Sequence, residues 1–179
     1  MRRLLLEGLL KPPLTEARPS DDDAMLAELS ERLQKSSRRA LGHSLSIRQV
    51  DAGSCNACEL EIHALNNVYY DLERFGLRFV ASPRHADVLL VTGPVTKNMR
   101  EALERTYNAT PNPKWVVAAG DCACGDGLFD GYAIVGSVEM VVPVDLRIRG
   151  CPPTPTALLQ GLVALMERAA AQDHPGSAR

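Results

Sequence analysis

The sequence lacks the features that mark several protein classes. Its 179 residues include five cysteines, too few for a disulfide scaffold, and this odd number favours reduced thiols that serve a metal in a reducing compartment. No stretch approaches the roughly 20 apolar residues that span a bilayer, so membrane contact would come through partners or a surface segment. A net charge of −2 and a pI near 6.1 provide no basic surface for nucleic acid.

A second cysteine pair and a histidine pair are also missing, and this bears on the kind of metal site. The sequence has one C-x-x-C, at Cys55 and Cys58, a pattern that serves iron–sulfur clusters, zinc sites and thioredoxin-like redox centres alike. Structural zinc sites more often add a second C-x-x-C or two histidines. The four histidines are scattered and are more typical of surface or capping positions: His43, His63, His85 and His174.

The N-terminal part divides into an arm with a linker, residues 1–20, and a helix within residues 21–45. Paired arginines before an apolar run are typical of twin-arginine export signals, but Glu7 interrupts the run and no A-x-A-like cleavage site follows. We therefore expect a short amphipathic arm that docks on a partner. Ser20 as N-cap, the acidic run after it and apolar residues at helical spacing predict the helix.

From residue 46 onward, short β-branched runs alternate with amphipathic segments. Runs such as V-L-L-V and W-V-V-A-A are apolar throughout, which is typical of strands buried on both faces of a parallel sheet. The alternation predicts an α/β domain over residues 46–171, with a flavodoxin-like, mostly parallel, doubly wound sheet, the N-terminal helical extension before it and a flexible tail at 172–179. Strands are expected at 46–50, 77–82, 87–92, 114–119 and 140–144. Helices are expected at 58–72, ended by Gly76, at 96–107, and from Pro155 behind a Thr154 N-cap.

Four cysteines fall in loops that follow predicted strands. Cys55 and Cys58 follow the first strand, Cys122 follows the run that ends at Ala119, and Cys151 follows the last strand. Loops at the carboxyl ends of parallel strands meet at one edge of the sheet, where ligands bind. Four thiolates are the usual ligand set of a cubane iron–sulfur cluster, so these loops predict one shared site.

Four segments of the sequence resemble a known family, the small iron–sulfur subunit of about 20 kDa that [NiFe] hydrogenases share with respiratory complex I. They are D-A-G-S-C-N-A-C-E-L-E, S-P-R-H-A-D-V-L-L-V-T-G-P-V-T, G-D-C-A and V-P-V-D-L-R-I-R-G-C-P-P-T-P. The resemblance implies one [4Fe–4S] cluster held by Cys55, Cys58, Cys122 and Cys151, facing a large catalytic subunit.

The first motif indicates a branch of this family. Complex I subunits typically have two adjacent cysteines there, whereas hydrogenase small subunits have C-x-x-C, as this sequence does, and the other segments look most like the membrane-bound formate hydrogenlyase and hydrogenase-4 type. The resemblance implies an electron relay on the cytoplasmic side of a membrane, with a large subunit that holds any [NiFe] centre, a ferredoxin-like iron–sulfur subunit and integral membrane subunits as partners. A complex I-like NADH or ferredoxin–quinone oxidoreductase subunit that passes electrons to quinone is the alternative; a zinc-stabilised interaction module is the alternative outside this class.

Three further positions have two interpretations each. Glu59 follows a cysteine of the first motif and either moves protons near the cluster or complements the dipole of a helix N-terminus. Cys124 departs from the family pattern and is either a buried free thiol or a competing ligand, with the G-x-C-A match favouring Cys122 as the ligand. Arg84 and His85 either form surface salt bridges or contact another subunit.

Overall fold

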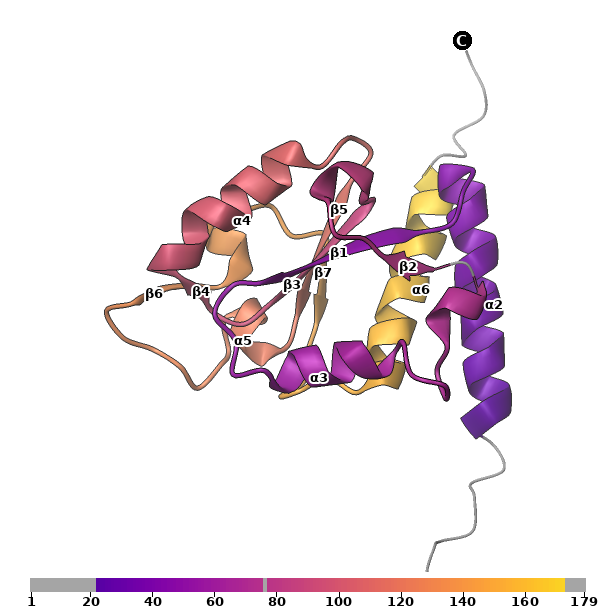
Figure 1. The fold of residues 1–179 in the computed structure, drawn as a ribbon, viewed down its shortest axis with the longest axis horizontal. Helices are drawn as coiled ribbons and strands as arrows, with labels where there is room; N and C mark the ends of the chain where they lie inside the picture. The colour runs from indigo at the N-terminus through magenta and orange to yellow at the C-terminus, as the bar shows by residue number, and fades with distance from the viewer. Residues whose placement is uncertain (1–21, 76, 173–179) are drawn as a thin grey trace, which may run out of the picture.

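The chain is built around a five-stranded parallel sheet, as the computed structural model shows for the residues that it describes, 22–75 and 77–172 (Figure 1). The strand order is β2-β1-β3-β5-β7. Counted along the chain within this sheet, that is the order 2-1-3-4-5 of flavodoxin-like folds, so the predicted fold class is confirmed. The strands are β1 (Ser46–Asp51), β2 (Arg78–Phe79), β3 (Val88–Thr92), β5 (Trp115–Ala119) and β7 (Leu146–Ile148).

Both faces of the sheet are buried against helices. Along β3, Val88 and Leu90 pack into one hydrophobic core, whereas Leu89 and Val91 pack into the other, as the alternation of a strand requires. The first core is covered by α2 (Asp22–Leu41), α3 (Ala57–Ala64) and α6 (Pro155–Gln172), and the second by α4 (Lys97–Ala109) and the short α5 (Asp121–Cys124) (Figure 1). The sheet is therefore doubly wound, with the continuous apolar runs at its centre.

Two helices begin where their capping residues predict. The Thr96 hydroxyl accepts a hydrogen bond from the Met99 N–H at 3.3 Å at the start of α4. The Thr154 hydroxyl accepts one from the Ala157 N–H at 3.2 Å, with Pro155 as the first residue of α6. The Ser20 cap and Gly76 lie outside the described residues, as do the arm, the linker and residues 173–179.

The expected helix over 58–72 is wrong in length, because α3 ends at Ala64. Beyond it, the side-chain Oδ1 of Asn67 accepts hydrogen bonds from the N–H groups of Tyr69 and Tyr70, both at 2.9 Å. An asparagine that bonds to the backbone two and three residues ahead offers the chain a turn in place of another helical turn. A 3₁₀ helix, η1 (Leu72–Phe75), follows and returns the chain to the sheet.

The expected strand at 140–144 is also wrong. The chain there forms a 3₁₀ helix, η3 (Val138–Met140), and an irregular segment, and the fifth strand is β7, further along. Pro143 has no N–H to donate to a ladder, which disfavours a strand at the predicted position. Unpredicted elements are a two-stranded antiparallel pair, β4 (Val95–Thr96) with β6 (Ile134–Gly136), and the 3₁₀ helix η2 (Pro83–His85).

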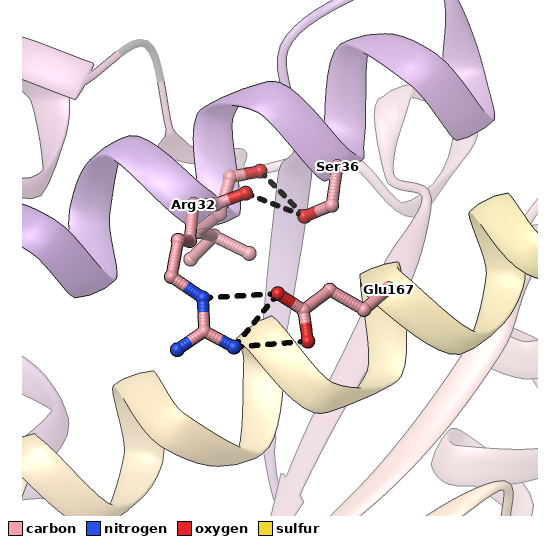
Figure 2. A network of polar contacts seen from close by, with 4 residues as sticks. Arg32, Ser36 and Glu167 are labelled. Carbon is pink, nitrogen blue, oxygen red and sulfur yellow. Dashed lines mark hydrogen bonds and ion pairs between the residues drawn. The ribbon is translucent and has the colours of Figure 1, made fainter.

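Helix α2 packs along α6 and shares its core. Leu26, Leu29 and Leu33 are buried in the same cluster as the leucines of α6. At the rim, the Arg32 guanidinium donates to both carboxylate oxygens of Glu167, at 2.9–3.1 Å, while the Ser36 hydroxyl donates to the Arg32 carbonyl oxygen (Figure 2). Among the described residues, no helix has both the length and the hydropathy needed to cross a bilayer.

Candidate iron–sulfur site

The four candidate cysteines lie on three loops at the carboxyl edge of the sheet. Cys55 lies between β1 and α3, Cys58 is in the first turn of α3, Cys122 is in α5 directly after β5, and Cys151 lies between β7 and α6. Because β1, β5 and β7 belong to one parallel sheet, these loops leave the sheet at the same edge. Cys55 and Cys151 are exposed there, and Cys58 and Cys122 are half-buried.

Gly120 shows how closely two of these loops approach. A Cβ on Gly120 would lie 2.6 Å from the Cys58 Sγ and 3.6 Å from the Gly150 carbonyl oxygen. Its φ of +97° also lies in the region that side chains disfavour. The predicted close approach of backbone at this glycine is therefore confirmed, and it places the Cys58 sulfur beside the end of β5 and the residue before Cys151.

The cysteines raise one another's pKa values, because thiolates at this edge repel. Burial, followed by repulsion from Glu59 and from the other three cysteines, raises the pKa of Cys58 from 9.0 to about 12. Burial and repulsion from Cys151 and Cys55 also raise the pKa of Cys122, although a hydrogen bond from the Leu128 backbone opposes this. These mutual effects show that the four thiol groups share one electrostatic environment.

Such a set of thiols fits an iron–sulfur group, whose irons supply the positive charge that lets neighbouring thiolates coexist. Among the described residues, no three His, Cys, Asp or Glu side chains stand close enough to hold one metal ion. Four thiolates on a single zinc ion all lie about 2.3 Å from it, whereas a cubane binds each thiolate through a different iron and needs wider spacing. The observed arrangement is looser than a single-ion site.

Local hydrogen bonds shape the loop that carries Cys55. The Asp51 carboxylate accepts from the N–H groups of Gly53 and Ser54, both at 2.9 Å, and turns the chain directly after β1. Asn56, between the two cysteines, adopts a left-handed conformation with φ of 74°, which asparagine tolerates better than most residues. Together these features bring Cys55 and Cys58 to the same side of the loop entrance to α3.

Glu59 is buried, at 5% exposure, in the first turn of α3. The Ser54 hydroxyl donates to its Oε2, whereas its Oε1 is buried and has no hydrogen-bond partner among the described residues. One oxygen therefore holds the cysteine loop against the helix. Its position at the helix N-terminus fits the dipole interpretation, and the proton-transfer interpretation stays a prediction.

Cys124 points away from the other cysteines. Its Sγ lies 3.7 Å from the Ala118 carbonyl oxygen and 4.0 Å from that of Ile148, and the side chain packs against the second core. The charged groups that affect its pKa are Arg149, Asp121, Arg147 and Asp126, and burial has the largest effect, raising that pKa. This supports the interpretation of Cys124 as a buried free thiol.

Arg84 and His85 lie at the opposite, amino edge of the sheet. Both are exposed and line a polar cavity of about 560 Å³ together with His43, Arg78 and Asp87. The Asp87 carboxylate accepts from the Ser46 N–H at 2.8 Å and approaches the His43 ring at 3.7 Å. No described contact joins this cavity to the cysteine edge.

Two residues of the site were missed by sequence reasoning. Asp121 bonds to the loop of Cys151, and Gly127 packs so tightly that a Cβ there would lie 2.5 Å from the Cys122 Sγ. Both sit near the third cysteine in sequence, but neither residue type signals a contact with a distant loop. The G-D-C-A segment itself was the available signal, and only its cysteine was used.

Comparison with known proteins identifies the family. Residues 55–165, more than half of the chain, match the family described as NADH ubiquinone oxidoreductase, 20 Kd subunit. A chain from the structure of the membrane-bound sulfane sulfur reductase, an archaeal respiratory membrane complex, superposes with a TM-score of 0.64 at 36% identity, covering 79% of this chain and 77% of that one. The fold and the family match therefore agree.

Curated relatives come from hydrogenase complexes. The chain is 44% identical over 131 residues to the probable membrane-bound hydrogenase subunit mbhJ of Pyrococcus furiosus, covering 73% of this chain and 78% of that protein. It is 43% identical over 144 residues to formate hydrogenlyase subunit 7 of Escherichia coli, covering 80% of this chain and 55%, about half, of that protein. The resemblance read from the sequence is confirmed: this chain belongs to the NADH ubiquinone oxidoreductase 20 kDa subunit family.

Proposed function

We propose that this chain is the electron-transfer small subunit of a membrane-bound [NiFe] hydrogenase complex of the formate hydrogenlyase type, and that it carries one [4Fe–4S] cluster on Cys55, Cys58, Cys122 and Cys151. One observation carries the proposal: three strand ends of a family-matched sheet bring four thiols into one electrostatic environment. Relatives named as hydrogenase subunits support the choice of complex.

The chain's own residues hold and enclose the cluster. When bound, the cluster supplies one-electron redox chemistry, and backbone N–H groups near sulfur, burial and nearby charge tune its potential. The Leu128 N–H at the Cys122 sulfur is one such group. Apart from these four, the sequence has only Cys124, so this chain holds one cluster and passes electrons between partners, and any nickel belongs to the large subunit.

An apolar docking face extends from the cysteine edge. It consists of Leu60, two residues after Cys58, and of Leu128, Phe129 and Tyr132 in the segment after α5; Leu128 and Tyr132 are 90% and 91% exposed. That segment projects from the sheet on the side opposite α2 (Figure 1). Exposed apolar groups beside a redox site fit a large partner subunit that covers the cluster. We therefore place the catalytic large subunit on this face.

The other partners follow from the single cluster. A ferredoxin-like iron–sulfur subunit would deliver or accept electrons, and integral membrane subunits would keep the chain at the cytoplasmic side of the membrane. Both assignments rest on relatives that are named as subunits of membrane-bound complexes.

A complex I-like role is the second candidate, and the description of the matched family favours it. In that role the same cluster passes electrons to quinone bound against the large subunit. Purifying the complex and sequencing the large subunit separates the two. Four nickel-binding cysteines in the large subunit support the hydrogenase, and their absence supports the quinone reductase.

Anaerobic purification with metal analysis tests the cluster itself. Four irons and four labile sulfides per chain are the expected result, whereas one zinc ion without sulfide would favour the interaction module. Cys151→Ser should abolish the paramagnetic resonance signal of the reduced cluster. Cys124→Ser is the matched control, because Cys124 bonds to strand carbonyls, and it should leave the signal intact. The reverse pattern would contradict the proposed ligands.

A further inference from the structure

We propose that Asp121 is a positioning residue that fixes the third cysteine of the site against the fourth. The inference rests on the proposed cluster and concerns how this chain keeps two distant ligands in register. Asp121 directly precedes Cys122, and Gly150 directly precedes Cys151. A rigid link between Asp121 and Gly150 therefore sets the separation of two ligand sulfurs.

The link is a reciprocal pair of hydrogen bonds. The Asp121 N–H donates to the Gly150 carbonyl oxygen at 2.9 Å, and the Gly150 N–H donates to the Asp121 Oδ1 at 2.9 Å. One residue earlier, the Gly120 N–H donates to the Ile148 carbonyl oxygen at 2.8 Å. The two loops are thus joined at three points just beyond the ends of their strands.

The side-chain bond is the one that the sheet does not supply. The parallel ladder between β5 and β7 ends at the Ala119 and Ile148 pair. Beyond it, the part-buried Gly150 N–H has the Asp121 carboxylate as its acceptor. A part-buried donor that loses its acceptor costs free energy, so without the carboxylate the Cys151 loop would shift to find another partner.

A second aspartate bridges the same two segments in a weaker way. The Asp126 carboxylate pairs with the Arg149 guanidinium, and both side chains are more than half exposed. Exposed ion pairs contribute little to stability, so this bridge is not expected to hold the ligands in place. Asp126 therefore offers a control with the same charge and the same pair of segments.

The test compares Asp121→Ala, Asp121→Asn and Asp126→Ala in the full-length chain, purified anaerobically with its accompanying subunits. The readouts are iron per chain, the rate of cluster loss to a ferrous chelator, the resonance spectrum and the midpoint potential. Asp121→Ala should weaken iron retention by about 10- to 100-fold, as expected when a group that orients a ligand is lost.

Asp121→Asn keeps an acceptor oxygen and should retain iron like the wild type. Its potential should move in the positive direction, because a negative charge near the cluster is removed. Asp126→Ala should retain iron. The proposal is overturned if Asp121→Ala retains iron like Asp126→Ala, or if Asp121→Asn loses it like Asp121→Ala. A wild-type chain without iron would overturn the proposed function as well, which separates that failure from the others.

Discussion

The thiols of the site differ in how easily they ionise, although they share one edge of the sheet. Cys58 is half-buried beside Glu59 and three other cysteines, whereas Cys55 and Cys151 are exposed. Alkylating reagents attack the thiolate, so the ionised fraction sets the rate of labelling. Burial therefore predicts an order of reactivity that the sequence motif alone does not contain.

In the metal-free chain at pH 8, we expect iodoacetamide to label Cys58 last among the four cysteines. A pKa raised from 9.0 to about 12 lowers the thiolate fraction of Cys58 at that pH by about a thousandfold. Because pH 8 lies below both values, the labelling rate of Cys58 should rise about tenfold per pH unit toward pH 11. Peptide mass spectrometry after timed quenching measures each site. Equal rates at Cys58 and Cys55 would show that the burial of Cys58 is not retained.

Helix α2 joins the domain through two kinds of contact that differ in strength. Leu33 is fully buried between α2 and the core, whereas the Arg32 and Glu167 pair lies at the exposed rim (Figure 2). Truncating a buried leucine loses transfer free energy and leaves a cavity, at about 2–5 kcal/mol. An exposed ion pair typically contributes about 0.2–1 kcal/mol.

We therefore expect Leu33→Ala to lower the free energy of unfolding by about 2–5 kcal/mol and Arg32→Ala by less than about 1 kcal/mol. Urea denaturation followed by circular dichroism measures both. If Arg32→Ala were the more costly change, the ion pair and not the leucine stripe would hold α2 in place.

Elements with a strong local pattern were predictable from the sequence. The apolar runs of β3 and β5, and the Thr154 and Pro155 start of α6, each combine periodicity with a clear end signal. The helix after Cys58 was overextended because the apolar spacing continues past Ala64, while the turn at Asn67 depends on side-chain bonds that periodicity does not report. The last strand was misplaced because the apolar residues around Pro143 outweighed the missing N–H.

The site was predictable in its sulfurs and not in its supports. Cysteines after separate strands converge because parallel strands end at one edge, and this follows from the fold class. The bond from Asp121 to Gly150 joins residues 29 positions apart, and its geometry depends on where β7 lies. Because the apolar pattern predicts that strand at the wrong residues, the contact could not be found from it.

At the scale of the whole molecule, the two edges of the sheet carry different surfaces. The amino edge holds the polar cavity with Arg78, Arg84 and His85, whereas the carboxyl edge holds the cysteines and the docking face. Electron transfer needs the cluster close to its partner, so the apolar carboxyl edge is the one that a large subunit should cover. The docking face can therefore be tested separately from the cluster.

We expect the double substitution Leu128→Ser and Tyr132→Ser to reduce co-purification of the large subunit by at least about tenfold, because both side chains are almost fully exposed and the loss of a few apolar anchors weakens an interface by about 2 kcal/mol or more. The iron content of the variant chain should stay unchanged, since neither side chain holds a sulfur. Met25→Ser, a partly exposed position on α2, is the control and should leave co-purification intact. Pull-down with quantitative mass spectrometry measures the ratio of subunits. Retention of the large subunit by the double variant, or its loss from the control, would place the interface elsewhere on the molecule.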